Sequence, residues 1–380
     1  MQKDLAKIDS KENYKDHLYA IIYAGGGGTR LWPKSLEDTP KQFLKIFGSQ
    51  TLIEITADRL NNFLDWDRIY VVTTSVPYGK EVKRLLPKVK DENVIVEPER
   101  KDSAAAHALG AIHILRRDPN AVIINTAADH FVSPLQNFKH TMLSASRFAF
   151  ETGGLVATGI KPTYPHTGLG HIKRGKKFSV SEGRYIYKLD KFVEKPQLEL
   201  AKKYTESGEY FWNACHFVWR ADSFMNEVEK YAKVLDLGMQ MIKQSLGKFN
   251  EMKVMSQEYK KFEKISVEYA IAEKSKNFFT IISDYSWTDI GDWNEVWKNL
   301  SKDENGNVVI DGDEEGGDII NIDTSDALIH KDGRMIAIID VDNIIVVDTP
   351  KALLICAKSK AQNVKKVVEL LKENKRTELL

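Results

Sequence analysis

The stretch that decides the fold is AIIYAGGGGTRLWP, residues 20–33. A run of apolar residues ends at four consecutive glycines, Thr29 and Arg30 follow directly, and Lys41 comes a little later. This pattern predicts a buried strand over residues 18–24 and, after it, a loop whose backbone N–H groups can surround an anion such as phosphate. A flexible glycine linker is the alternative, but linkers seldom follow a buried strand near the start of a domain.

The glycine loop matches neither of two common phosphate-binding motifs. The P-loop pattern needs glycine where Arg30 stands, and the dinucleotide pattern GxGxxG fails at Arg30 or Leu31 in either register. The loop still offers many N–H donors, with Arg30 and Lys41 as nearby cations. Because arginine binds two phosphate oxygens at once and lysine adds a mobile charge, a triphosphate suits it better than a single phosphate.

Length and composition describe an ordinary globular protein. The chain has 380 residues, 42% hydrophobic and 29% charged, with a formal net charge of +1, so we expect no nucleic-acid partner and no membrane partner. Its two cysteines, Cys215 and Cys356, are far apart, which argues against a disulfide framework. Residues 1–16 are polar and lack the apolar core of a signal peptide, so we expect a cytoplasmic protein.

The first 160 residues alternate strand-like and helix-like patterns at the spacing of βαβ units, which predicts an α/β fold with a doubly wound, mainly parallel sheet. Ligands of such sheets bind beyond the carboxyl ends of the strands, where the glycine loop also lies. One expected helix is opened by Asp102 and Ser103 as candidate caps. Further along, residues 223–246 are expected to form one long helix.

From Val308 onward short β-rich runs recur, separated by Gly, Asp and Asn, which predicts an all-β coil or a small sandwich. A terminal amphipathic helix is expected over residues 361–373. We therefore predict a polar lead-in (1–16), a main domain (17–303) and a small β-rich domain (304–380).

A second candidate stretch is NTAADH, residues 125–130. Small residues such as Ala127 at the end of a strand allow a ribose or phosphate to come close, and Asp129 is a candidate Mg²⁺ ligand because Mg²⁺ prefers oxygen. Asp129 as a helix cap is the alternative. His130 is a weaker candidate for a general base, since a phosphate nucleophile needs none.

A third stretch, WTDIGDW at residues 287–293, holds a second candidate metal ligand, Asp289. An aspartate in a tight turn is the equally weighted alternative. Two carboxylates from separate strand ends that share one metal ion are a recurrent arrangement in phosphoryl transfer.

Three further stretches could bind a sugar. Glu194 and Lys195 in FVEKP could hold sugar hydroxyls and a phosphate, unless they form only a surface ion pair. Asn213 is a lone amide among aromatic residues and could serve a sugar or the core. The glycines of HTGLGH, including Gly170, allow a ligand to approach the backbone.

Taken together, these stretches resemble the sugar-1-phosphate nucleotidyltransferase family. The glycine loop, Lys41, Asp129, FVEKP, Asn213 and Asp289 occur in the family's order over about the first 300 residues. The resemblance implies a Rossmann-like nucleotidyltransferase fold with a small C-terminal domain like a left-handed β-helix, which often supports a homodimer in this family. LWP, PKQFL, Glu97-Pro98 and WTDIGDW resemble the branch that joins mannose 1-phosphate to GTP.

That resemblance implies the reaction of GTP with α-D-mannose 1-phosphate to give GDP-mannose and pyrophosphate, with Mg²⁺ as cofactor. Arg30, Lys41 and Asp129 would be catalytic, and Asp129 and Asp289 would hold the metal. Glu97 would read guanine. The remaining substrate-binding residues would be Ala24, Gly25, Gly26, Gly27, Gly28, Thr29, Ser103, Ala127, Gly170, Glu194, Lys195 and Asn213.

The chain departs from the family in two places. Residues 101–105 read KDSAA where this branch commonly has RNTAP, which leaves phosphate or base contacts there open. Cys215 stands where the family has glycine after Asn213, so the fit to the sugar could differ. The alternatives are the same chemistry with another hexose or heptose 1-phosphate or another nucleotide, or a non-catalytic sensor of sugar nucleotides.

Overall fold

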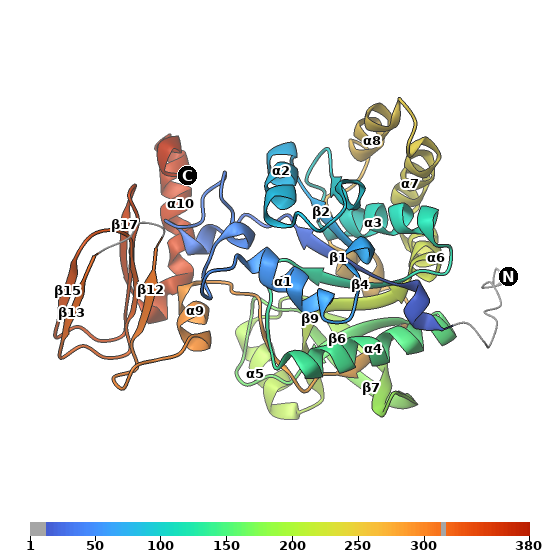
Figure 1. The fold of residues 1–380 in the computed structure, drawn as a ribbon. Helices are drawn as coiled ribbons and strands as arrows, with labels where there is room; N and C mark the ends of the chain where they lie inside the picture. Colours follow the sequence, from blue (N-terminus) through green and yellow to red (C-terminus); the bar gives the residue numbers. More distant parts are fainter. Residues whose placement is uncertain (1–12, 313–316) are drawn as a thin grey trace. The chain divides into compact units, whose positions relative to one another are not determined.

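A computed structural model describes residues 13–312 and 317–380. The chain forms two compact units (Figure 1), each built from segments far apart in sequence. We call the first the sheet unit; it contains the residues up to Gly25, Ala57–Ala127 and Val132–Trp287. We call the second the coil unit; it contains Gly26–Thr56, Ala128–Phe131 and Thr288–Leu380. Of the predicted lead-in, residues 1–12 lie outside the described residues, and a short 3-10 helix spans Tyr14–His17.

The sheet unit is built around a nine-stranded mixed sheet with the order β3-β2-β1-β4-β9-β6-β10-β8-β7. Successive pairings place seven of these strands in one direction and reverse only β8 and β9, so the predicted mixed, mainly parallel sheet is confirmed. The strands are β1 (Leu18–Ala24), β2 (Ile69–Thr73), β3 (Val94–Val96), β4 (Val122–Ala127), β6 (Leu155–Ile160), β7 (His171–Ser181), β8 (Arg184–Val193), β9 (Tyr210–Arg220) and β10 (Phe278–Ile282). Two short strands, β5 (Phe131–Ser133) and β11 (Ser286–Thr288), lie where the chain passes between the units.

Strand β1 is an inner strand of the sheet and is almost entirely buried. It pairs in parallel with β2 on one side and with β4 on the other, for example Ala20 with Ile69 and Ile21 with Asn125. A parallel strand covered by helices on both faces needs an unbroken apolar sequence, which explains the run before the glycines. Parallel pairing also brings the carboxyl ends of β1 and β4 to the same edge.

Strand β9 runs against both of its neighbours. Its pairing with β4 places Phe217 opposite Asn125, and its pairing with β6 places Asn213 opposite Gly159. Because β9 is antiparallel, its early residues lie at the edge where β4 and β6 end. Asn213 therefore comes to the ligand-binding edge from the beginning of a strand.

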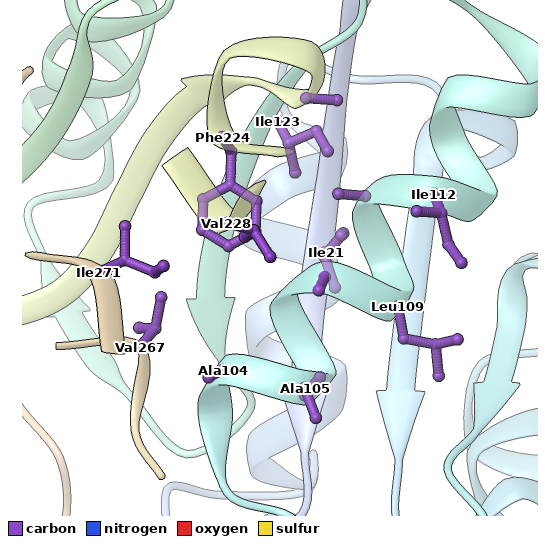
Figure 2. Close-up of a cluster of buried hydrophobic side chains, with 14 of the residues drawn as sticks. Ile21, Ala104, Ala105, Leu109, Ile112, Ile123, Phe224, Val228, Val267 and Ile271 are labelled. Carbon is purple, nitrogen blue, oxygen red and sulfur yellow. The ribbon is translucent and has the colours of Figure 1, made fainter. Parts of the chain in front are cut away.

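Helices cover both faces of the sheet. Figure 1 shows α3 and α6 on one side and α4 on the other. Figure 2 shows Ala105 and Leu109 of α3 near Ile21 of β1 and Phe224 of α6, all of them buried. The helices of this unit are α1 (Leu52–Asn61), which begins in the coil unit, α2 (Val76–Leu85), α3 (Ser103–Arg117), α4 (Leu135–Thr152), α5 (Leu198–Ser207), α6 (Ala221–Tyr231), α7 (Lys233–Ser245) and α8 (Glu251–Tyr259).

Most helix predictions are confirmed, including the cap of α3, where the Asp102 side chain accepts a hydrogen bond from the Ser103 amide. The single helix expected over residues 223–246 is wrong. Ala232, at φ −137° and ψ 61°, leaves the helical region and divides it into α6 and α7. The sequence offers no glycine or proline at this point, so local propensity gives no sign of the break.

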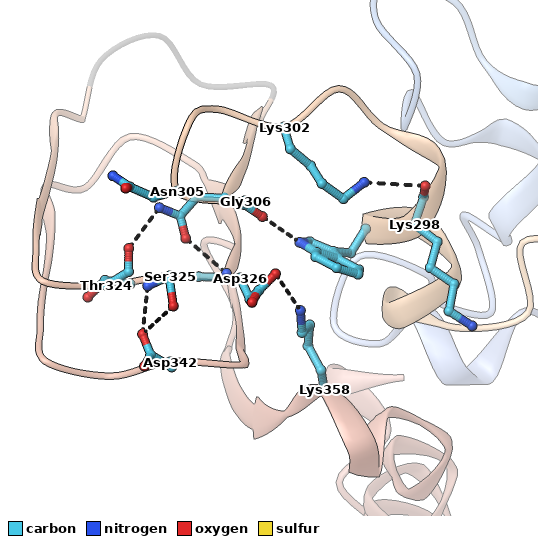
Figure 3. Close-up of polar contacts among 12 residues, drawn as sticks. Lys298, Lys302, Asn305, Gly306, Thr324, Ser325, Asp326, Asp342 and Lys358 are labelled. Atoms are coloured by element: carbon cyan, nitrogen blue, oxygen red, sulfur yellow. Dashed lines mark hydrogen bonds and ion pairs between the residues drawn. The ribbon is translucent and has the colours of Figure 1, made fainter.

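The coil unit confirms the predicted coil of short strands. β12 (Val308–Asp311), β14 (Leu328–Lys331) and β16 (Ile344–Asp348) pair in parallel, β17 (Leu353–Ala357) adds an antiparallel strand, and β13 (Ile319–Ile322) pairs with β15 (Ile336–Ile339). Figure 3 shows polar contacts that join successive turns. The Asp326 amide donates to the Asn305 carbonyl, and the Ser325 amide donates to the Asp342 carboxylate at 2.7 Å.

The hydrophobic core of the coil unit contains residues from an early segment of the chain and from its C-terminal region. Leu31, Trp32 and Leu44 belong to the same buried cluster as Leu328 and Val347. Helices α9 (Trp293–Asn299) and α10 (Val364–Glu373) complete this core. The compact units therefore do not follow a single cut in the sequence, and the predicted boundary at 303/304 stays a prediction.

Candidate functional site

Three predicted charged residues meet in the coil unit. The ammonium nitrogen of Lys41 lies 2.6 Å from a carboxylate oxygen of Asp129 and donates a hydrogen bond of 3.0 Å to the backbone carbonyl of Asp289. Burial opposes the charge of Lys41, but the carboxylates of Asp129 and Asp289 outweigh it and raise the pKa of the lysine. The lysine is therefore a firmly held cation next to two acids.

The glycine loop fixes where the Lys41 side chain starts. Gly28 has φ +60°, and a Cβ added there would lie 2.7 Å from the Cβ of Lys41. Lys41 begins a 3-10 helix, Lys41–Phe43, whose Phe43 is buried together with the next residue, Leu44. Glycine at position 28 is thus required by both backbone conformation and close packing.

The middle of the loop is open. Gly26 and Gly27 are exposed, and a Cβ added at either would meet nothing within 4 Å. Thr29 and Arg30 form a 3-10 helix with Leu31, and Arg30 is exposed while Leu31 is buried. The loop therefore has room for a ligand and an unburied guanidinium beside it.

Two acids in this group have the chemistry of a Mg²⁺ site, since each offers carboxylate oxygens. Within residues 13–312 and 317–380, no group of three or more His, Cys, Asp or Glu side chains could hold a metal ion alone. Mg²⁺ commonly binds through one or two carboxylates with water and substrate phosphates as further ligands. Asp129 and Asp289 fit that kind of site.

In the sheet unit, the predicted small residues lie at strand ends. Ala24 ends β1, and its carbonyl accepts a hydrogen bond of 2.8 Å from the Thr73 hydroxyl. Ala127 ends β4 opposite Tyr23. Gly25 follows β1, and a Cβ there would lie 2.8 Å from the Thr74 methyl group, so a larger residue would have to displace the Thr74 side chain.

The predicted sugar-binding residues also gather in the sheet unit. The backbone N–H of Asn213 donates a hydrogen bond of 2.8 Å to the Gly170 carbonyl, and a Cβ at Gly170 would collide with the Glu194 carboxylate. Lys195 pairs with Glu194 at 2.8 Å, and its side chain is exposed while that of Glu194 is largely buried. Gly170, Glu194, Lys195 and Asn213 thus form one polar group, at the edge where β6 ends.

This group also contains Cys215, whose effect on the sugar fit was left open, and Glu268, which was not predicted. Glu268, in a short π-helix (Glu268–Ala272), lies 3.3 Å from the Asn213 amide nitrogen and 3.5 Å from the Cys215 sulfur. Burial raises the pKa of Glu268, and the nearby charge of Glu194 raises it further. Cys215 has φ +52°, a conformation that favours glycine, which agrees with the glycine of the family at this position.

Glu97 lies elsewhere in the sheet unit. Only 4% of it is exposed, and the Tyr259 hydroxyl donates a hydrogen bond of 3.2 Å to it. Burial raises the pKa of Glu97 to about 8, so it is mostly protonated near pH 7. A protonated acid accepts fewer hydrogen bonds than a carboxylate. Glu97 would therefore have to lose this proton before it could bind guanine as predicted.

Ser103 binds within the protein: its hydroxyl accepts a hydrogen bond of 2.9 Å from the Val267 amide, next to Glu268. His130 is buried, with a ring nitrogen 3.8 Å from the Asp129 carboxylate. The roles of both residues toward a ligand stay predictions.

Known proteins resemble this chain over most of its length. A family model described as "Nucleotidyl transferase" matches residues 19–306, more than half of the chain. The chain belongs to the nucleotidyl transferase family. A second model, described as a "MannoseP isomerase/GMP-like beta-helix domain", matches residues 317–371 of this nucleotidyl transferase and covers β13–β17 of the coil.

Several relatives of this nucleotidyl transferase are named mannose-1-phosphate guanylyltransferases. A mannose-1-phosphate guanylyltransferase of Escherichia coli (strain K12) is 33% identical over 365 residues, which are 95% of this chain and 75% of that protein. One from Salmonella montevideo is 33% identical over 362 residues, 94% of this chain and 74% of that protein. A crystal structure from Thermus thermophilus, named "mannose-1-phosphate geranyltransferase", superposes with a TM-score of 0.83 at 27% identity, over 94% of this chain and 99% of that chain.

These comparisons confirm the resemblance stated from the sequence. Substrates of nucleotidyl transferases in this family are a nucleoside triphosphate and a sugar 1-phosphate, and members generally use a divalent metal ion. Among the described residues of this member, no helix has both the length and the hydrophobicity needed to cross a membrane.

Proposed function

We propose that this nucleotidyl transferase moves GMP from GTP to α-D-mannose 1-phosphate, giving GDP-mannose and pyrophosphate. The observation that carries the proposal is the Lys41 ammonium, held 2.6 Å from Asp129 and hydrogen-bonded to Asp289 beside an open glycine loop. Such a group of charges suits a triphosphate. The choice of guanine and mannose rests on the names of relatives about one-third identical to the chain.

In the proposed reaction an oxygen of the sugar phosphate attacks the α-phosphorus of GTP in line. The bond from that phosphorus to the bridging α–β oxygen breaks, and pyrophosphate leaves with the electron pair. The nucleophile is already an anion, so the protein needs no general base, and His130 has no required part. Catalysis then consists of positioning the two substrates and neutralising charge.

The coil unit supplies the charge neutralisation in this proposal. N–H groups of the loop from Gly26 to Gly28, with Thr29, would surround the triphosphate, and Arg30 and Lys41 would balance the charge that grows on pyrophosphate. Asp129 and Asp289 would hold Mg²⁺, which supplies further charge neutralisation when bound.

The sheet unit supplies the remaining contacts. Glu194, Asn213 and Gly170 would bind the sugar, and Lys195, whose side chain is exposed, would bind its phosphate. Ala24, Gly25 and Ala127, at the ends of β1 and β4, would contact the ribose and phosphates. Ser103 would lie near the base, which Glu97 would contact once deprotonated.

One experiment tests the activity. Pyrophosphate release is measured for GTP, ATP, UTP and dTTP, each with mannose, glucose and heptose 1-phosphates, with and without Mg²⁺. We expect the highest turnover with GTP, mannose 1-phosphate and Mg²⁺ together. Turnover with UTP or dTTP but not GTP would overturn the guanylyl assignment, and no turnover with any pair would favour a sensor of sugar nucleotides.

We also propose a cytoplasmic homodimer. Ile320, Ile322 and Ile339 of the coil unit are 45–60% exposed, which supports an interface between two copies. Light scattering coupled to size-exclusion chromatography would give twice the 43.2 kDa of the chain, and a monomeric mass would contradict the proposal.

A further inference from the structure

One of the two acids that the proposed function gives to the metal, Asp129, already holds a cation through its carboxylate. The Lys41 ammonium lies 2.6 Å from Asp129 and 3.0 Å from the Asp289 carbonyl. Only 12% of the Lys41 side chain and 18% of the Asp129 side chain are exposed. Water therefore screens this ion pair less than a pair on the surface, and the two charges attract each other more strongly.

The fold holds the lysine in this place. The carbon stem of Lys41 packs against Gly28, where even a single added Cβ would lie 2.7 Å away. The two residues that follow Gln42, Phe43 and Leu44, are buried and anchor the 3-10 helix that begins with Lys41. The contact with Asp129 is therefore a property of the packed chain, unlike that of a flexible surface lysine.

A divalent ion on Asp129 would need the same carboxylate. Mg²⁺ binds oxygens at about 2.0–2.1 Å, so an ion and the ammonium group on one carboxylate would be close neighbours and would repel each other. The described residues contain no cluster of three or more His, Cys, Asp or Glu side chains that could hold the ion without help. A triphosphate would remove the conflict, because it would attract the ammonium and supply oxygen ligands itself.

We propose that the Lys41 ammonium takes the place of the divalent ion on Asp129 in the nucleotide-free protein, so that the ion binds tightly only together with the triphosphate. The identity of that polyanion rests on the proposed function, whereas the competition between Lys41 and the ion does not. Metal and nucleotide then increase each other's affinity by the same factor, since binding linkage is reciprocal.

The test is a titration of the nucleotide-free protein with Mn²⁺, with free hydrated Mn²⁺ measured by electron paramagnetic resonance. We expect weak binding by the wild type and binding at least tenfold tighter by Lys41→Met. Adding Asp129→Asn to Lys41→Met should abolish that gain. The matched control is Lys372→Met, which removes the same charge from an exposed ion pair with Glu37 at 2.8 Å and should bind as the wild type does.

Lys41→Gln is a second variant in case Lys41→Met does not fold, as checked by circular dichroism. If neither folds, the wild type still tests the proposal, because tight binding of one Mn²⁺ without nucleotide would overturn it. Equal affinity in wild type and folded Lys41 variants would overturn it too, as would an equal gain in Lys372→Met. A gain in Lys41→Met, with no nucleotidyl transfer by the wild type on any pair of substrates, would leave the competition standing and reject only the proposed function.

Discussion

The side-chain amide of Asn213 lies 3.3 Å from the carboxyl group of Glu268, a residue 55 positions further along the chain. The two side chains are buried, and Asn213 also binds the Gly170 carbonyl through its backbone. Glu268 thus helps to hold the direction of the Asn213 side-chain amide, together with the Cys215 backbone N–H, which donates a hydrogen bond of 3.1 Å to its oxygen.

We expect Glu268→Ala to raise the Michaelis constant for mannose 1-phosphate about tenfold, because losing a buried hydrogen-bond partner costs about 1–2 kcal/mol. The Michaelis constant for GTP should stay near the wild-type value. Glu268→Gln should have a smaller effect, since an amide of the same shape keeps the contact. Steady-state kinetics with each substrate varied in turn would check this, and an unchanged constant for the sugar phosphate in Glu268→Ala would contradict it.

The metal assignment makes a second prediction. Asp129→Asn and Asp289→Asn should each lower kcat by roughly 10² or more, because each removes charge that supports metal-assisted transfer. Asp311→Asn, which breaks an exposed ion pair with Lys331, is the matched control and should leave kcat unchanged. Near-wild-type rates in either of the first two variants would exclude that residue from the metal site.

The buried Glu97 predicts a pH dependence of stability. Its pKa is about 8 in the folded protein and near 4.5 when the chain unfolds, so between these values the folded state keeps a proton that the unfolded state loses. Raising the pH through this window therefore destabilises the fold, by at most about 1.4 kcal/mol per pH unit.

Glu97→Gln should remove that dependence. The midpoint of thermal unfolding of Glu97→Gln, relative to that of the wild type, should therefore rise between pH 5 and pH 8. Glu99→Gln, at a more exposed acid two residues away, should follow the wild type. Parallel curves for Glu97→Gln and the wild type across this range would show that Glu97 is ionised in the folded protein.

The conformation of Cys215 gives a fourth prediction. At φ +52° a residue with a Cβ is strained, by about 1 kcal/mol, and glycine is not. Cys215→Gly should therefore be about 1 kcal/mol more stable than Cys215→Ala, although both lose the sulfur. Denaturant unfolding of the two variants would measure this difference in stability. Equal midpoints would contradict the prediction and would mean that the backbone relaxes at this position.

Local sequence patterns were sufficient for the elements that depend on burial and capping. The unbroken apolar run of β1 is enough to predict a strand that is buried on both faces. The cap of α3 depends only on Asp102 and the adjacent Ser103. The reversed direction of β9 could not be predicted, because direction depends on which strands lie beside it. The end of α6 at Ala232 likewise has no local signal.

The sequence predicted those site residues that are charged or lie next to glycines and strand ends. Lys41, Asp129 and Asp289 stood beside strand ends or glycines, and the structure brings them together in one unit. Glu268, although charged, was not predicted, since one acid in an amphipathic segment looks the same as a solvent-facing residue. Only its contact with Asn213 distinguishes it, and that contact depends on tertiary structure.

The shared core of the coil unit has a consequence for biosynthesis. Leu31, Trp32 and Leu44, which anchor the segment carrying Arg30 and Lys41, pack in one cluster with Val364 and Val368. Leu31, Trp32 and Leu44 are synthesised early, and Val364 and Val368 follow only after about three hundred further residues. The early segment therefore lacks these hydrophobic partners during most of translation. The charged loop is therefore completed after synthesis, and a premature stop late in the message would harm it as directly as a mutation within it.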